Sequence, residues 1–370
     1  MKGEIILLRL IDVGRKINLK KAVNVIHGIQ DKLIIKKRDT PKYVDFPEPI
    51  RLEKTQEVTA TAQNINQVDL LIKLYEDGVI SLTARLKFSN IELQDLFSIR
   101  KFKFYIDNKE YNINQILKLE ETKIINQLEE CIEEIGYNFG ITDNEKYTVY
   151  CISDFFENPK SFINENRKII AHLLIGEDPN LKLHQNQVDR TLENNFSYEE
   201  NDYVNFDFDR SIIIDPTEDY NDILTVIEIA NYQLLELRIL DKLLTRRLNL
   251  AEPDISKIYT MSGTLWRRLN KKVGKLMRLR YDLSYLLENV ENVSKLFGDF
   301  YLAQLYTRLA ELFQLKEWSA SVRHRIDMIG DIYNVAQTNL NEKFLLYMEI
   351  LLTFIFVIEF IFLILGYFIK

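Results

Sequence analysis

The apolar stretch at the C-terminal end constrains the fold of this chain more than any other feature. Residues 350–369 contain a single charged side chain, Glu359, among apolar and aromatic residues. A helix of this length, rising about 1.5 Å per residue, covers the roughly 30 Å hydrocarbon core of a bilayer. Its apolar residues fall on every side, which is unusual for the core helix of a water-soluble protein. The pattern predicts one transmembrane anchor at residues 344–370.

The charges beside this stretch predict on which side of the membrane the rest of the chain lies. Arg323, Arg325 and Lys343 precede the stretch, and Lys370 alone follows it. Basic residues close to a span tend to stay on the cytoplasmic side. We therefore expect a single-pass protein of the cell inner (cytoplasmic) membrane, with the bulk of the chain in the cytoplasm.

The N-terminus is typical of a strand rather than of an export signal. Its apolar run, Ile5–Leu8, is too short for the core of a signal peptide, and Arg9 and Asp12 follow it. Cys131 and Cys151 form no disulfide framework and suit a reducing compartment. Both observations agree with a cytoplasmic location for the body of the protein.

Residues 1–153 predict a mixed α+β domain. The strongest local signal is a hairpin, because the turn Glu76-Asp77-Gly78 separates the runs LLIKLY and VISLTARLKF. Helical periods occur at residues 91–97 and 113–135, and residues 147–152 return to a strand pattern. We expect a sheet combined with several helices.

Residues 154–215 are expected to connect this domain to a helical one. Their composition becomes acidic, since residues 188–222 hold eleven Asp and Glu against two Arg. Within this region the runs 203–208 and 210–214 are typical of a small pair of strands.

Residues 216–343 predict an antiparallel helical bundle or stalk domain, whose long last helix continues into the span. A long amphipathic helix is expected at residues 219–249, with an interruption at Pro253. Before the span, apolar residues recur in steps of four and three, the heptad spacing of helices in a bundle or a short coiled coil. This heptad seam consists of Val322, Ile326, Ile329, Tyr333, Ala336 and Leu340. Its last four residues are candidate contacts of a homo-oligomer.

The junction before the span resembles the end of the Rmd/Rmnd-type (required for meiotic nuclear division) family of single-span membrane proteins. Leu340-Asn341-Glu342-Lys343 is followed by Glu349 at the membrane entrance and by Glu359 ten residues further on. The preceding segment, His324–Leu340, is similar in character to the helix that leads into that family's junction. The resemblance implies a non-enzymatic homo-oligomer at the inner face of a membrane, and in mitochondria a protein that supports translation by holding ribosomes there.

Glu359 lies about ten residues into the predicted span. An ionised carboxylate at the centre of a span costs about 2.5 to 3.5 kcal/mol on insertion scales. The side chain is therefore expected to face a protein partner, to be protonated or to lie near water. An oligomer contact is the first hypothesis, and an ion path or a tolerated buried glutamic acid are the alternatives.

A basic helix is expected at residues 266–280, WRRLNKKVGKLMRLR, a segment without any acid. Its cations surround a stripe of leucine and valine and would attract the phosphates of RNA or of anionic lipid headgroups. The alternative is a solvated helix face paired with the acidic stretch of the same chain. The candidate partner-binding residues are Arg267, Arg268, Lys271, Lys272, Lys275 and Arg278.

The sequence shows no motif for catalysis or for metal binding. Its four histidines lie far apart, and no zinc, redox or phosphate-loop spacing occurs. Asp202, Asp207 and Asp209 do not follow a calcium-loop spacing, since Arg210 stands where such a loop needs glycine. We therefore expect a solvated acidic loop, no cofactor, no metal and no enzymatic activity.

These observations favour a membrane-anchored, homo-oligomeric scaffold or tether that faces the cytoplasm and holds a ribosome, RNA or another partner at the membrane. One alternative is an oligomeric cation channel or transporter with Glu359 facing the pore. A membrane-anchored enzyme of unknown substrate is the other.

Overall fold

The computed structural model describes most of the chain, in two compact units. The described residues are 1–13, 16–27, 29–30, 49–57, 59–60, 65, 67–106, 109–133, 142–154, 159–193, 195–260, 299–368 and the single positions 274, 281, 284, 287, 288 and 291. The first unit consists of Met1–Leu240 with Glu288–Ser319, and the second of Asp241–Leu287 with Ala320–Lys370.

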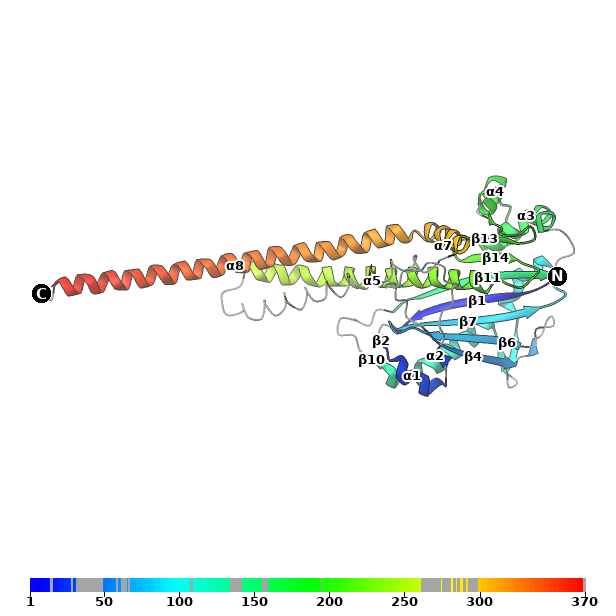
Figure 1. The fold of residues 1–370 in the computed structure, drawn as a ribbon, viewed down its shortest axis with the longest axis horizontal. Helices are drawn as coiled ribbons and strands as arrows, with labels where there is room; N and C mark the ends of the chain where they lie inside the picture. The colour runs from blue at the N-terminus through cyan, green and yellow to red at the C-terminus, as the bar shows by residue number, and fades with distance from the viewer. Residues whose placement is uncertain are drawn as a thin grey trace. The chain divides into compact units, whose positions relative to one another are not determined.

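The first unit is built on a nine-stranded sheet (Figure 1). Strands β11 and β14 pair in parallel, and the other neighbouring strands of the described sheet pair in antiparallel fashion. In spatial order the strands are β12 (Asn195–Phe196), β13 (Tyr203–Phe206), β14 (Arg210–Ile214), β11 (Asn144–Asp154), β1 (Lys2–Asp12), β7 (Val79–Phe88), β6 (Gln67–Leu74), β4 (Ile50–Glu57) and β3 (Ile29–Gln30).

Strand β1 lies near the middle of this sheet because its sequence, KGEIILLRLID, suits burial on both faces. Nine of its eleven residues are buried, and it pairs along its length with β7 and with β11. The predicted hairpin is confirmed, since β6 and β7 pair across the turn at residues 75–78. Gly78 has a φ of 101°, which the turn requires and which glycine adopts without steric cost.

Helices cover both faces of the sheet (Figure 1). One face packs on α1 (Leu19–Ile26), α2 (Ile113–Gln127) and α3 (Pro159–Ile175) over an apolar core that includes Ile5, Leu7 and Ile116. The opposite face meets the first part of α5 (Asn221–Thr260) and α7 (Phe300–Leu312). Tyr306 of α7 donates a hydrogen bond to Gln233 of α5. The remaining short elements of the unit are α4 (Gln185–Glu193), the 3-10 helices η1 (Leu93–Lys101) and η2 (Glu129–Cys131), and the strands β2 (Lys16–Ile17), β5 (Thr59–Ala60), β8 (Phe104–Ile106), β9 (Lys109–Tyr111) and β10 (Ile132–Glu133).

The region predicted as a connector, residues 154–215, is part of the α+β fold. The predicted pair at 203–208 and 210–214 is confirmed as β13 and β14. However, β14 also pairs with β11, so this pair extends the large sheet instead of standing apart from it. The acidic composition reflects the exposed loops and helix α4, whereas the buried strand Arg210–Ile214 carries the connection to the sheet.

The second unit is helical, as predicted, and contains most of α8 (Leu315–Phe368), a continuous helix of 54 residues. Arg325 of α8 forms an ion pair with Asp241 of α5 at 3.2 Å. Helix α5 does not stop before Pro253, contrary to the expected interruption, because a proline removes one hydrogen bond of a helix without having to end it.

Candidate functional site

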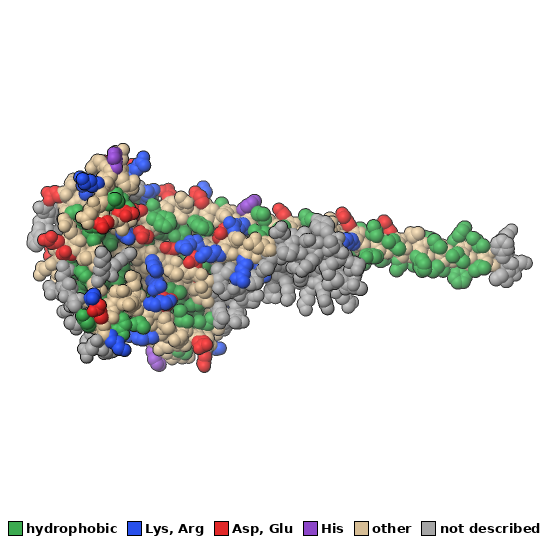
Figure 2. Space-filling model, turned by 180° about the vertical axis from the view of Figure 1, so that it is seen from behind, with side chains coloured by type: hydrophobic (Ala, Val, Ile, Leu, Met, Phe, Trp, Pro, Cys, Tyr) green, Lys and Arg blue, Asp and Glu red, His purple; other side chains and the backbone are tan. Residues whose placement is uncertain are grey.

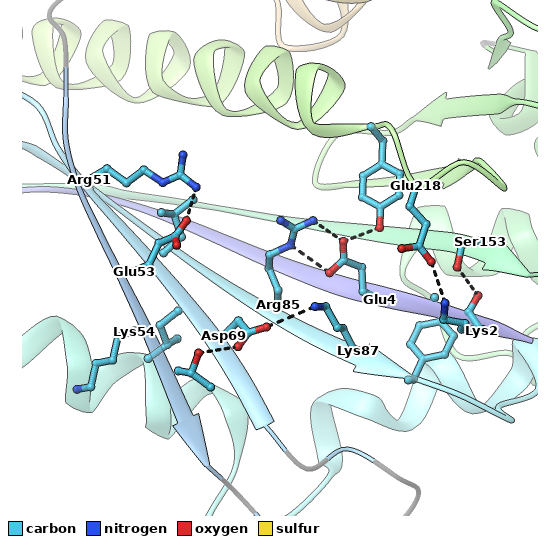
Figure 3. A pocket seen from close by; sticks show the side chains of 16 residues that line it. Lys2, Glu4, Arg51, Glu53, Lys54, Asp69, Arg85, Lys87, Ser153 and Glu218 are labelled. Carbon is cyan, nitrogen blue, oxygen red and sulfur yellow. Dashed lines mark hydrogen bonds and ion pairs between the residues drawn. The ribbon is translucent and has the colours of Figure 1, made fainter. Parts of the chain in front are cut away.

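The first unit contains a polar pocket of about 670 Å³ on the sheet face that α5 partly covers. Figure 3 shows charged side chains from neighbouring strands directed towards it, near the residues that precede α5. The lining residues are Lys2, Gly3, Glu4, Arg51, Glu53, Lys54, Thr55, Asp69, Leu70, Leu71, Arg85, Lys87, Phe88, Ser153, Glu218 and Tyr220.

The innermost feature of the pocket is a buried carboxylate held by three donors. Glu4, which is 3 % exposed, accepts hydrogen bonds from Arg85 Nε at 3.0 Å and Arg85 Nη2 at 2.5 Å. The Tyr220 hydroxyl donates to the same carboxylate at 2.5 Å. A buried charge is tolerated only when it is paired and hydrogen-bonded in this way. The cluster therefore connects β1, β7 and the residue before α5.

Arg85 of this cluster and the neighbouring Cys151 have shifted pKa values. Burial lowers the pKa of Arg85, but the hydrogen bonds and the charge of Glu4 outweigh that effect and raise it above its usual value. Burial raises the pKa of the Cys151 thiol well above its usual value, and the charge of Glu4 raises it further. A thiol of this kind stays protonated and is a poor nucleophile. The hydrogen bonds of the cluster hold β1, β7 and the residue before α5 together.

The rim of the pocket consists of solvent-exposed ion pairs. Lys2 pairs with Glu218 at 3.1 Å, and Lys87 lies 3.7 Å from Asp69. Arg51 pairs with Glu53 on the same strand. Exposed pairs of this kind contribute about 0 to 1 kcal/mol each, so they exchange readily with water or with a charged ligand. Most of the residues that line the pocket are polar or charged, so the pocket is suited to polar ligands.

A second polar cluster ties α5 to the turn between β6 and β7. The Tyr232 hydroxyl donates a hydrogen bond to Asp77, and the Tyr232 ring lies 5.0 Å from that of Tyr75. Glu228, one turn earlier on α5, accepts from Tyr75 at 3.2 Å and pairs with Lys73. Burial raises the pKa of Asp77 to about 7, the charge of Glu76 adds to this, and backbone hydrogen bonds act in the opposite direction.

Glu236 extends this cluster by one further turn of α5. Burial raises its pKa well above the usual value, and the charges of Asp77 and Asp12 raise it further. The cluster thus gathers carboxyl groups from β1, the β6–β7 turn and α5. Across the described residues, no three His, Cys, Asp or Glu side chains are arranged to hold a metal ion.

The acids singled out in the sequence serve local structure. Asp202 accepts hydrogen bonds from the backbone N–H groups of Tyr198 at 2.9 Å and of Glu199 at 3.0 Å, which closes a turn. Asp207 accepts from the backbone N–H of Phe208 at 2.7 Å.

The C-terminal part of α8 exposes large apolar side chains on all its sides. Its most apolar window is long enough to cross a membrane, and none of that window is buried. Figure 2 shows the corresponding hydrophobic side chains in green along the end of the helix. Glu359 is exposed among them. By its length and composition, this helix could form the single membrane span that the sequence predicts.

The predicted oligomer contacts fall in different environments. Ile329 is buried within the single chain, with 2 % of its surface exposed. Its seam neighbours are buried too, Val322 at 0 % and Ile326 at 4 % exposure. Tyr333, Ala336 and Leu340 lie on α8, but the positions of their side chains are outside the described part. The candidate partner-binding residues of the basic helix, Arg267, Arg268, Lys271, Lys272, Lys275 and Arg278, also lie outside the described residues.

Sequence reasoning missed both polar clusters of the first unit. The local signal was a charged residue within a mostly apolar strand, as at Glu4 in β1 and at Arg85 in β7. Tyr220 and Glu228, which complete the clusters, are more than 140 residues away in sequence from their partners. Such pairings do not appear in any local pattern.

The chain belongs to the family described as "Uncharacterized protein MJ0711, N-terminal domain", which matches residues 2–220. It is 29 % identical over 293 residues to the protein "Uncharacterized protein MJ0711" of Methanocaldococcus jannaschii, and this match covers 76 % of the present chain and 77 % of that protein. No solved structure matches the chain. Every residue that lines the pocket lies within the matched range 2–220.

The family match shows that the resemblance to the Rmd/Rmnd-type family was wrong. That resemblance rested on residues 324–359, outside the range 2–220 that defines the family. A short polar junction before an apolar helix is a requirement that the bilayer imposes on every anchor, so unrelated proteins share it. The N-terminal sheet carries the family relationship.

Proposed function

We propose that this chain is a non-enzymatic, homo-oligomeric scaffold or tether, anchored by α8 in the cytoplasmic membrane with the bulk of the chain on the cytoplasmic side. The observation that carries the proposal is the exposed apolar surface of α8 from Phe344 to Leu365. The basic residues before the span, Arg323, Arg325 and Lys343, support the cytoplasmic orientation.

The exposed surface supports a membrane environment on energetic grounds. Phe354, Phe356, Phe360 and Phe362 are each at least 64 % exposed. Burying one such side chain is worth about 1.5 to 3 kcal/mol, and a monomer in water rarely exposes more than a few hundred Å² of contiguous apolar surface. Over the whole span the gain exceeds the cost of the single acid, Glu359.

The activity of a tether is to raise local concentration. A partner held at the membrane meets membrane-bound components at a high effective concentration, without any new contact having to form. The polar pocket and the basic sequence at residues 266–280 are the two features that support the binding of a charged partner, such as a ribosome, RNA or anionic lipid.

Membrane fractionation tests the anchor. The full chain should stay in the membrane pellet after washing with high salt and with alkaline carbonate, whereas a chain ending at Asn339 should be released into the supernatant. The control is a chain in which Lys370 alone is removed, which should stay in the pellet. Release of the full chain by carbonate would contradict the proposal.

Orientation is tested in the same membranes. Protease added to inverted inner-membrane vesicles should digest the α+β unit, and intact right-side-out spheroplasts should protect it. The opposite protection pattern would place the bulk of the chain outside the cytoplasm.

A further inference from the structure

Helix α8 offers two different faces for contacts between helices. The sequence predicted oligomer contacts at Glu359 and at the last four residues of the heptad seam. Its first three residues, Val322, Ile326 and Ile329, are however already buried within the single chain. Ser321 and Arg325, on the same segment, contact Asp241 of α5. This part of the seam therefore packs against the protein's own helices.

Glu359 lies on another face of α8. Ile329 and Glu359 are 30 positions apart (359 − 329) on one uninterrupted helix. At about 100° per residue, their side chains point roughly 120° apart around the axis. A surface that includes Glu359 is therefore distinct from the surface that the chain buries internally.

The neighbours of Glu359 on its own face follow from helical spacing. Residues three, four and seven positions away share a face of a helix. By this spacing the Glu359 face includes Leu352, Ile355, Phe356, Phe362 and Leu363, which are between 45 % and 73 % exposed. Nothing in the described part of the chain buries this face, since the apolar window of α8 is not buried at all.

We propose that a second copy of this chain packs along the Glu359 face, parallel to the first and related to it by a two-fold axis along the membrane normal. The inference deepens the proposed function, on whose membrane anchoring it rests. The two copies enter the bilayer from the same side, so their Glu359 side chains lie at the same depth and meet across the axis.

The chemistry of Glu359 favours an identical partner. A carboxylic acid that is neutral carries one O–H donor and free acceptor positions, so two such groups satisfy each other's hydrogen bonds. Neither copy then exposes an ionised or unsatisfied group to lipid, which is the costly alternative. Leu352 and Leu363 lie one to two turns on either side of Glu359 and would supply packing above and below it.

Cysteine cross-linking in native membranes tests the face. Leu352→Cys and Leu363→Cys lie on the Glu359 face, and Phe354→Cys and Ile361→Cys, the matched controls, lie roughly 140° to 160° away from it. The native Cys131 and Cys151 are buried and stay in place. Oxidation should give a disulfide-linked dimer of twice the chain mass for the first two variants, at least several times the yield of the controls.

Substitution of Glu359 tests the hydrogen bond. In the Leu363→Cys chain, Glu359→Gln keeps a donor and an acceptor and should keep the cross-link. Glu359→Leu should weaken self-association about threefold to thirtyfold, the range that polar contacts between membrane helices contribute. Equal yields on both faces, or a product containing another protein in place of a second copy, would overturn the inference. If either of these results is found while the chain stays in the carbonate-washed pellet, only the contact between two copies is overturned. If the chain leaves the pellet, the proposed membrane anchoring is overturned as well.

Discussion

At the scale of single residues, the protein places ionisable groups where water cannot reach them. Glu4 accepts hydrogen bonds from Arg85 and from Tyr220, and it forms an ion pair with Arg85. Asp77 accepts a hydrogen bond from Tyr232, and burial of its carboxyl group raises its pKa to about 7. Burial therefore favours the protonated form of Asp77.

The pH dependence of stability should reveal the state of Asp77. Its pKa is about 7 in the folded chain against an ordinary 3.8, so the folded state binds more protons between these values and stability falls as pH rises through this window. The full effect is at most roughly 4 kcal/mol. Asp77→Asn should flatten the decline of Tm between pH 5 and 8. Glu165→Gln, on an exposed site of α3, is the control and should leave the decline as steep as in the natural chain.

At the scale of elements, β1 determines the packing of the first unit. It lies between β11 and β7, contributes Glu4 to the pocket, and buries apolar residues on both faces. At its first residues the register with β11 shifts, and the two backbones approach closely at Gly3. The close approach leaves no room for a side chain.

Gly3→Ala should therefore destabilise the sheet. A Cβ atom at this position would lie 2.1 Å from the backbone oxygen of Cys151, so one strand has to move. We expect a loss of about 1 to 3 kcal/mol, seen as a lower urea midpoint at an unchanged slope. Gly274→Ala is the matched control, since nothing lies within 4 Å of a Cβ there. A midpoint for Gly3→Ala equal to that of Gly274→Ala would show that the strands separate at no cost.

At the scale of the whole molecule, the charge distribution decides which partners can bind. The net charge of −7 disfavours general binding to nucleic acid. The basic segment at residues 266–280 is a local exception within this acidic chain, and the rim of the pocket carries both signs of charge. A phosphate-bearing partner is therefore expected to bind locally and to be sensitive to salt.

The salt dependence of RNA binding tests the basic segment. Arg267→Glu, Lys271→Glu and Lys275→Glu combined, in the full chain in nanodiscs of neutral lipid, should abolish binding to single-stranded RNA. In the natural chain the logarithm of the affinity should fall with the logarithm of the salt concentration, by about 0.7 for each phosphate contacted. The same charge change at Lys20, Lys109 and Lys182, which are exposed in the α+β unit, is the control. Equal loss of RNA binding in both triple variants would show that the net charge of the chain, and not the basic segment, determines binding.

The sequence by itself determined the features that local patterns encode. An apolar run of sufficient length predicts a span, because the bilayer thickness sets the number of residues needed. The turn Glu76-Asp77-Gly78 specifies the β6–β7 hairpin, because its flanking strands pair across a short loop. The strand pair at residues 203–206 and 210–214 could be predicted for the same reason.

Only the tertiary structure decided what depends on contacts between distant residues. The parallel pairing of β11 with β14 makes residues 154–215 part of the sheet, although their composition favoured a connector. Glu4, Arg85 and Tyr220 form one cluster from positions far apart in the chain. The heptad seam shows which apolar residues of α8 share one face. Helical periodicity does not show which other surface buries that face. In this protein the chain buries the first part of the seam itself, because a helix of the same chain is held at a high effective concentration beside it.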